Sequence, residues 1–294
     1  MSTDALDIGA PPRRSRRRNS SLARALRQRQ TQVGLVITLL VLGVALLGPL
    51  FASYEPSAIV GLPAQGPSAA FPLGTDALGR DVLSRVLWGG RNLVWVAFLA
   101  TALGVFVGAA LGMLAGYSRS WLDDALMRTM DIVLAFPQII LVLLFVSMLG
   151  TKLWLVAVLI AASWVPQVAR VARGVTSEIV EREYIQAAEA IKVPAHRILR
   201  REVLPNIITP LAVEFGLRLT WSIALVAAIS FLGFGIQPPN ADWGLMISEN
   251  REIITIQSLP LLVPAACIAL LAIGTNFVTE GWARTIARTT GRDG

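Results

Sequence analysis

The sequence predicts an all-α integral membrane protein with six transmembrane helices and with both termini in the cytoplasm. Hydrophobic residues make up 54% of the 294-residue chain and charged residues 15%, and the mean hydropathy is +0.62. Soluble domains carry about 25% charged residues. Six stretches are apolar over about 20 residues, the length at which a helix crosses the hydrocarbon core. They cover residues 32–52, 92–117, 130–150, 153–172, 210–235 and 259–282.

The positions of the arginines predict the orientation. Residues 1–31 are polar and contain Arg13, Arg14, Arg16, Arg17, Arg18, Arg24, Arg27 and Arg29. Positive residues gather on the cytoplasmic side of a membrane protein, so this tail is expected there and near lipid, without order of its own. Six crossings return the tail 283–294 to the same side. Because the basic residues follow the sides of the membrane, the formal net charge of +7 does not indicate nucleic-acid binding.

Residues 53–91 form the predicted extracytoplasmic segment, which begins with turn-forming residues and ends in a short amphipathic helix at 81–89. Within it, residues 74–81 partly match the phosphate-binding pattern G-x-x-x-x-G-K-[ST]. Arg80 stands in place of the lysine and Asp81 in place of the hydroxyl that binds magnesium. The sequence therefore predicts that this chain does not bind ATP.

The core, 92–282, contains the other five predicted spans. Gly104, Gly108, Gly112 and Gly116 recur every fourth residue in the first of them. Small residues at this spacing form a smooth strip on one helix face, against which another helix packs closely.

Residues for catalysis are scarce. His196 is the only histidine and Cys267 the only cysteine, which excludes a zinc site of several histidines and an internal disulfide. His196 is interpreted as a solvated residue of a cytoplasmic loop and not as part of a Ser-His-Asp triad. The sequence shows no pair of acid and base groups and no metal cluster of the kind that a membrane-bound enzyme would need. A stand-alone secondary transporter or channel remains an alternative, although buried ion-coordinating groups are few.

The polar loop 176–205 is predicted to lie in the cytoplasm as two short helices, 177–193 and 194–204. Ala187, Ala188 and Ala190 present little bulk. Apolar anchors toward the membrane or a partner are provided by Ile185, Ile191, Ile198, Leu199 and Val203. The residues leave two interpretations open: a docking surface for another protein, or an interfacial connector between two spans.

Glu214 and Arg218 are the charged pair inside a predicted span. Their i, i+4 spacing lets them neutralise each other on one helix face. The pair either lines a substrate pathway or is a structural ion pair. Arg128 and Asp131 form a second predicted pair, of structural character.

Several blocks resemble a known family. They are 71–92 (FPLGTDALGRDVLSRVLWGGRN), Gly116-Tyr117, 127–131 (MRTMD), 135–137 (AFP), 230–239 (SFLGFGIQPP) and Trp243-Gly244. In order and spacing they resemble the C-type permease of the dipeptide, oligopeptide and nickel branch of ABC importers, over about residues 71–282. The resemblance implies the type I ABC importer permease fold.

In that family the cytoplasmic loop is the EAA motif, whose coupling helix inserts into a groove on the ATPase subunit. The resemblance assigns this role here to Tyr184, Gln186, Ala187, Ala188, Glu189, Ala190, Lys192, Pro194, Leu204 and Pro205. Gln186 stands where the family usually has glutamate, and Lys192 where it usually has glycine. Because left-handed geometry costs a non-glycine residue roughly 1 kcal/mol, we expect Pro194 to form the turn instead.

The resemblance also implies the partners. They are a second homologous permease, two ATP-binding subunits that hold ATP and magnesium, and an extracytoplasmic substrate-binding protein. The chain itself is then a transport subunit, not an enzyme, and needs no cofactor. Peptides are the expected substrates, carried through the cell membrane by alternating access. Nickel, glutathione or another small peptidic ligand is the alternative.

Overall fold

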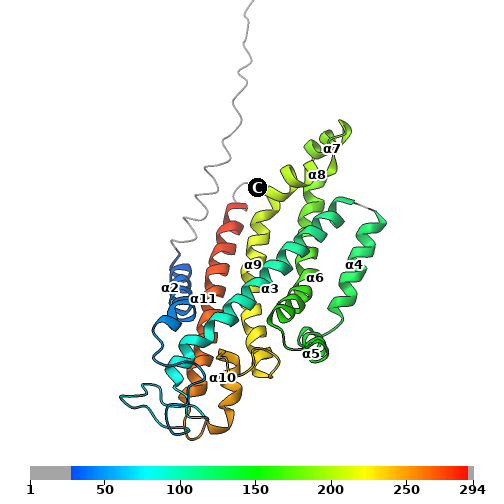
Figure 1. Cartoon of the computed structure of the whole chain (residues 1–294). Helices are drawn as coiled ribbons and strands as arrows, with labels where there is room; N and C mark the ends of the chain where they lie inside the picture. The colour runs from blue at the N-terminus through cyan, green and yellow to red at the C-terminus, as the bar shows by residue number, and fades with distance from the viewer. Residues whose placement is uncertain (1–27, 119, 291–294) are drawn as a thin grey trace, which may run out of the picture.

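The computed structural model describes residues 28–118 and 120–290, and in these ranges the chain is helical apart from connecting loops and two isolated β-bridges. Figure 1 shows the long helices side by side in a bundle. The helices are α2 (Arg29–Leu47), η1 (Gly48–Leu50), α3 (Val82–Ser118), α4 (Trp121–Leu134), α5 (Gln138–Leu149), α6 (Leu153–Val180), α7 (Glu183–Ala190), α8 (Ala195–Ile198), η2 (Leu199–Val203), α9 (Leu204–Phe231), α10 (Trp243–Glu249), η3 (Arg251–Ile253) and α11 (Leu259–Thr290).

The bundle has two ends, which carry different elements. The start of α2, the end of α11 and helices α7 and α8 lie at one end, which we call the α7 end (Figure 1). The opposite α10 end carries α10 and the loop between η1 and α3. The first and last described helices therefore begin and end on the same side of the bundle as the polar loop.

Five helices of the described residues are long and apolar enough to span a membrane, and a sixth span exists if the bent pair α4–α5 counts as one. The span predicted at 130–150 is not one continuous helix. α4 already begins at Trp121, and α4 and α5 meet at an angle of 81°. Pro137 explains the break, because a proline disfavours helical geometry in the residue before it, here Phe136.

Helix α3 is longer than predicted. The amphipathic helix expected at 81–89 and the span expected at 92–117 are one continuous helix of 37 residues. Arg85 lies in its first turns and is fully buried, so this part of the predicted extracytoplasmic segment belongs to the core.

The glycine strip packs α3 against α6, as predicted. A Cβ atom at Gly104 would lie 3.0 Å from the carbonyl oxygen of Ala161, and one at Gly112 would lie 2.3 Å from that of Ala169. Gly108 and Gly116 approach the α6 backbone in the same way. The four glycines thus let two spans pack with their backbones nearly in contact.

Helices α2 and α11 pack along each other at the edge of the bundle. Gly34 lies against Phe277, and the side-chain amide of Gln30 donates to Glu280 at 2.8 Å. The helices extend into both predicted tails, 1–31 and 283–294, because α2 begins at Arg29 and α11 continues to Thr290. The remainder of the predicted tails, 1–27 and 291–294, lies outside the described residues.

Two apolar clusters form the core. The larger lies between α2, α3, α5, α6, α9, α10 and α11 and includes Trp164 and Trp243. The smaller lies at the α7 end and contains Ile179, Ile185, Ile198, Val203 and Ile207, so the polar loop is anchored by a core of its own.

Candidate functional site

The loop after α6 turns back onto the bundle through two residues. α6 ends at Val180, and the chain reverses at Glu181 and Arg182 before α7 begins. Ile185, in the first turns of α7, is fully buried in the smaller apolar cluster. One side of α7 is therefore anchored to the bundle by the buried side chain of Ile185.

The opposite side of α7 is exposed. Of the predicted coupling residues, Tyr184, Gln186, Ala187, Glu189, Ala190, Lys192, Pro194 and Pro205 are exposed. Ala188 lies one turn beyond Ile185 on the inner face, and it is half-buried against the cluster. The apolar residue Ile191 is 78% exposed. The uncovered surface, which we call the α7 face, is therefore formed by Ala187, Ala190 and Ile191 rather than centred on Ala188.

Lys192 forms the turn after α7, contrary to the expectation that Pro194 would replace it. Its φ is +57°, in the left-handed region. The amide of Lys192 donates to the carbonyl of Glu189 at 2.9 Å, and the amide of Val193 donates to that of Ala188 at 3.0 Å. This pair of bonds is the Schellman ending of a helix, which usually has glycine in the left-handed position. Lysine thus takes the conformation of the family's glycine.

The second predicted helix, 194–204, does not end at Leu204. From Ala195 the chain stays helical to Phe231, with the π-helical turn η2 at Leu199–Val203. Pro205 is the second residue after this turn. Proline lacks an N–H and its ring clashes with the carbonyl four residues earlier, and a π-turn can relieve both problems. Leu204 and Pro205 therefore lie in a long helix that connects the loop rigidly to α9.

A hollow of about 250 Å³ lies between α7 and the helix that follows it. Its lining combines apolar and charged side chains: Tyr184, Ala188, Val193, Arg197, Ile198, Arg201 and Glu202. Arg197 and Arg201 are exposed and one turn apart. The inner side of the loop is thus a small basic hollow beside the α7 face.

Glu214 and Arg218 form the predicted ion pair. Arg218 donates to Oε2 of Glu214 at 2.8 Å, and their side chains are 17% and 13% exposed for Arg218 and Glu214. Arg218 also donates to the side chain of Gln167, and its guanidinium lies 5.2 Å from the ring centre of Trp164. The pair is therefore joined to α6.

A buried polar chain that the sequence did not indicate continues from this pair. The indole N–H of Trp164 donates to the hydroxyl of Ser222 at 2.9 Å, and Thr101 donates to the same hydroxyl at 2.9 Å. Thr101 and Ser222 are fully buried. These hydrogen bonds connect α3, α6 and α9 inside the bundle. No sequence signal identified it, since single Ser and Thr residues are common in membrane helices.

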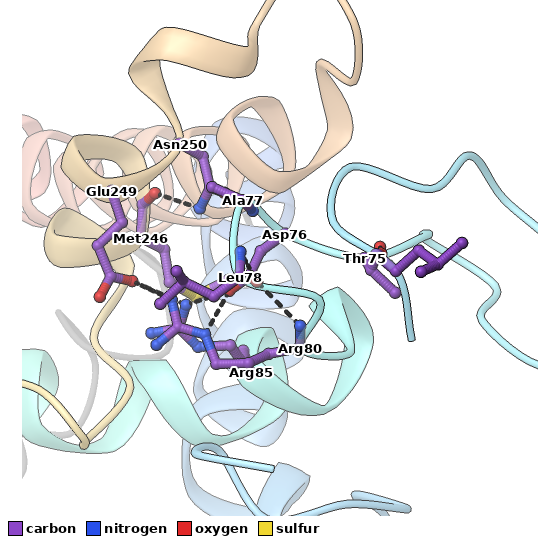
Figure 2. A network of polar contacts seen from close by, with 10 residues as sticks. Thr75, Asp76, Ala77, Leu78, Arg80, Arg85, Met246, Glu249 and Asn250 are labelled. Atoms are coloured by element: carbon purple, nitrogen blue, oxygen red, sulfur yellow. Dashed lines mark hydrogen bonds and ion pairs between the residues drawn. The ribbon is translucent and has the colours of Figure 1, made fainter. Parts of the chain in front are cut away.

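A second unpredicted group is a buried acid–arginine cluster at the α10 end, shown in Figure 2. Asp76 accepts from Nε of Arg80 at 2.6 Å and from Arg85 at 2.6 Å. Glu249, at the end of α10, lies 2.9 Å from Arg80 and 2.7 Å from Arg85. Asn250 accepts from the amide of Ala77 at 3.0 Å. The cluster joins the loop before α3 to α10.

This cluster explains the residues that interrupt the phosphate-binding pattern. Arg80 is engaged by two carboxylates, and Asp81 caps α3 by accepting from the amide of Ser84 at 2.9 Å. Burial alone would raise the pKa of Asp76. The hydrogen bond from the Arg80 amide and the charges of Arg85 and Arg80 outweigh burial, and they hold that pKa below its usual value.

Helix α4 is held to α6 by charges at the α7 end. Arg173 donates to both carboxylate oxygens of Asp123 at 2.5 Å. Asp131 pairs with Arg170 of α6, not with Arg128 as predicted from its spacing. Both bridges connect elements that are far apart in the sequence.

The comparisons with known proteins agree with this architecture. Residues 108–292 match the family described as binding-protein-dependent transport system inner membrane component. The chain is 36% identical over 74% of its length to the glutathione transport system permease protein GsiD of Pectobacterium atrosepticum, covering 72% of that protein. It is 35% identical to the dipeptide transport system permease protein DppC of Alkalihalophilus pseudofirmus, with 85% of this chain and 82% of that protein covered.

A third relative is the probable D,D-dipeptide transport system permease protein DdpC of Escherichia coli, 33% identical with 85% of each chain covered. The predicted resemblance to ABC importer permeases of the dipeptide branch is thereby confirmed. Such permeases are transport subunits rather than enzymes. The chain belongs to the family of binding-protein-dependent transport system inner membrane components and is a multi-pass inner-membrane protein.

Proposed function

We propose that this protein is one of two permease subunits of an ATP-driven importer of di- and oligopeptides. The observation that carries the proposal is the exposed α7 face on a rigidly anchored helix, in a chain whose relatives are named as dipeptide and glutathione permeases. In this proposal the α7 end lies in the cytoplasm and the α10 end outside, both termini are cytoplasmic, and the bent pair α4–α5 serves as the sixth span of a type I permease.

The α7 face suits a protein groove. Ala187 and Ala190 have small side chains, so another backbone can approach α7 closely, and Ile191 offers one exposed apolar anchor. Ile185 and Ile198 hold the other side of the loop in the smaller cluster, each at most 1% exposed. A force on α7 would therefore be transmitted to α9 through the continuous helix that starts at Ala195.

The energy comes from partners in this proposal. Two ATP-binding subunits bind ATP and magnesium and push on the coupling loops of this chain and of a second, homologous permease. The two permeases then alternate between outward-open and inward-open states, while an extracytoplasmic binding protein supplies the substrate. This chain itself holds no cofactor.

Peptides are the proposed substrates because two of the relatives described above are named for dipeptides. Glutathione is a second candidate, favoured by the name of the 36% identical relative, and it is itself a small peptide. Nickel chelates and a stand-alone secondary transporter are less well supported. Glu214 and Arg218 are proposed to line the path, where their charges can hold a peptide terminus transiently.

Reconstitution tests the proposal. The chain, its partner permease, both ATPases and the binding protein are placed in proteoliposomes, and uptake of a labelled dipeptide is measured. We expect uptake to need ATP and to be unaffected by a proton gradient alone. Uptake that persists without ATP but with a proton gradient would contradict the proposal.

The docking surface is tested with paired variants. Ala187→Trp fills the exposed α7 face, so it is expected to abolish ATP-dependent uptake while the permeases stay assembled. Ala188→Trp instead pushes into the protein's own cluster and is expected to lower thermal stability. Gly174→Trp, on exposed α6 surface with no atom within 4 Å of its position, is the matched control. Normal uptake in Ala187→Trp would exclude the coupling role.

A further inference from the structure

A hollow of about 520 Å³ opens at the α10 end, between the start of α3, the segment before it and the loop that leads into α10. Small-molecule sites typically have volumes of about 300–1,000 Å³. The lining combines aromatic, charged and amide side chains: Glu55, Trp88, Arg91, Asn92, Trp95 and Asn240. The hollow is therefore large enough for a short peptide and is chemically mixed.

The charged side chains around this hollow are unpaired among the described residues, whereas those of the acid–arginine cluster are paired with one another. Within residues 28–118 and 120–290, no hydrogen bond or ion pair engages the side chains of Glu55 or Arg91. One hollow thus offers a free carboxylate and a free guanidinium.

A line of aromatic rings leads from the hollow along an exposed face of the bundle to α9. Trp95 lines the hollow and packs edge-on against Phe98 at 6.4 Å, and Phe98 packs edge-on against Phe215 of α9 at 5.8 Å. Phe215 adjoins Glu214 in the chain, and Arg218 follows about one turn later. Trp95 and Phe98 are 58% and 47% exposed. The rings therefore run from the hollow to Phe215 of α9, the helix that also carries the Glu214–Arg218 pair, along a face that this chain leaves open.

We propose that this hollow is the outer subsite of the transport path and that it takes the charged termini of a short peptide. The guanidinium of Arg91 receives the peptide carboxylate. The carboxylate of Glu55 and the faces of Trp88 and Trp95 receive the ammonium group, which aromatic faces attract. The side-chain amides of Asn92 and Asn240 satisfy the peptide group.

This subsite rests on the proposed import of peptides, and a zwitterionic lipid headgroup is the competing occupant. Two observations favour the peptide. The lining contains two amides, Asn92 and Asn240, which match a peptide bond that a phosphatidylethanolamine headgroup lacks. The aromatic line also continues to α9, the helix that carries the Glu214–Arg218 pair, and a binding site for a lipid headgroup does not require such a line.

Photo-crosslinking tests the subsite on the intact transporter in phosphatidylcholine nanodiscs, without ATP. The probe is a dipeptide with a photoreactive side chain, and labelled segments are mapped by mass spectrometry. We expect labelling of the first turns of α3. Arg91→Gln should reduce labelling roughly tenfold, the effect of losing one charge-assisted hydrogen bond. With a C-terminally amidated probe, the wild type and Arg91→Gln should label equally.

Matched variants separate recognition from general effects. Glu55→Gln should reduce labelling by the free dipeptide but not by an N-acetylated one. Arg251→Gln and Glu252→Gln change exposed charges at the same end of the molecule, outside the hollow, and should leave labelling unchanged. Trp95→Ala should reduce labelling, whereas Trp154→Ala, an equally exposed tryptophan at the start of α6, should not.

Unchanged labelling in both Arg91→Gln and Glu55→Gln would overturn the subsite. So would native mass spectrometry of the detergent-purified transporter in which these variants lose co-purified phosphatidylethanolamine while peptide labelling stays the same. Because labelling is measured without ATP, it decides the subsite even if proteoliposomes show no ATP-driven peptide uptake. Absent uptake would contradict the proposed function, whereas normal uptake with labelling elsewhere would contradict only the subsite.

Discussion

Arg85 and Asp76 form an ion pair at 2.6 Å in which the side chains are 1% and 0% exposed, respectively. Both also belong to a group of four charges: Arg80 contacts Asp76, and Glu249 contacts both arginines (Figure 2). The group joins the loop before α3 to the end of α10. Its members come from two segments more than 160 residues apart in the chain.

Removing one charge from this group should be costly. Asp76→Asn leaves two buried arginines with only Glu249 as a carboxylate partner, and breaking a buried pair costs about 3–5 kcal/mol. We expect a clear fall in the midpoint of thermal unfolding in detergent. Glu252→Gln, an exposed acid in the adjacent turn, is the control and should unfold like the wild type. Equal midpoints for the two variants would contradict the structural role.

The same residue predicts an acid response. The pKa of Asp76 is lowered in the folded protein, so its contribution to stability is complete above the unfolded value of 3.8. That contribution is lost as the pH falls through the lower folded pKa. The wild type should therefore lose more stability below pH 3.8 than Asp76→Asn does, measured as unfolding midpoints against pH.

Asp242, the N-cap of α10, should respond in the opposite direction. Complete burial raises the pKa of Asp242 to about 6, although the amide of Leu245 donates to it at 3.1 Å. The folded state then holds a proton more tightly than the unfolded state, so stability falls as the pH rises from 3.8 to about 6.

Asp242→Asn keeps the acceptor for Leu245 and removes the charge. It should be more stable than the wild type above pH 6, by at most about 3 kcal/mol, and equal to it near pH 4. Unfolding midpoints at the two pH values decide this prediction. A wild type that gains stability between pH 4 and pH 6 relative to Asp242→Asn would show the sign to be wrong.

The α3–α6 contact predicts a strict requirement for glycine. A Cβ at Gly112 would lie 2.3 Å from the carbonyl oxygen of Ala169 and 2.7 Å from Cβ of Ala172. Gly112→Ala should therefore cost about 1–3 kcal/mol through overpacking. Gly174→Ala, where no atom lies within 4 Å, should instead be neutral or stabilising by up to about 1 kcal/mol. Thermal unfolding of both variants measures the difference.

Replacing Lys192 with glycine should stabilise the protein. Its φ of +57° costs a side-chain-bearing residue about 1 kcal/mol, and glycine removes that cost. Lys192→Gly is expected to raise the unfolding midpoint slightly. Lys152→Gly, at a position with φ of −80°, gains nothing from glycine and serves as the control. A stability loss in Lys192→Gly larger than that in Lys152→Gly would contradict the strain.

The Glu214–Arg218 pair can be tested for more than a structural role. Glu214→Ala and Arg218→Ala should each lower peptide uptake severalfold, while Arg284→Ala, in the exposed pair with Glu280, should not. The exchanged variant Glu214→Arg/Arg218→Glu restores an i, i+4 pair. If the pair lines the path, this variant assembles but its uptake stays low. Full recovery of uptake in the exchanged variant would show that the pair has only a structural role.

Much of the fold was predictable because its causes are local. An apolar run of about 20 residues has one stable arrangement in a bilayer, so residues 32–52 or 259–282 identify a helix without knowledge of their neighbours. The glycine period of four likewise predicted a packing face. The pair Glu214–Arg218 was predictable for the same reason, since both residues lie on one helix.

Some errors arose where distant segments meet. Spacing suggested Arg128 as the partner of Asp131, but α4 packs on α6 and brings Arg170 instead. One error was local: the break between α4 and α5 is caused by the adjacent residues Phe136 and Pro137, in a run whose composition alone favours one helix. Lys192 keeps a left-handed turn because Ile185 and Ile198, buried on both sides of it, determine where the chain must reverse.

The sequence alone determined that this chain is a membrane-spanning bundle with a polar loop of the importer type, because hydropathy and motif order are properties of the chain itself. Only the tertiary structure decided which residues of the loop face outward, which partners the buried charges take, and that free charges line a hollow at the α10 end. Those features depend on contacts between segments far apart in the chain, and no local pattern encodes which segments will meet.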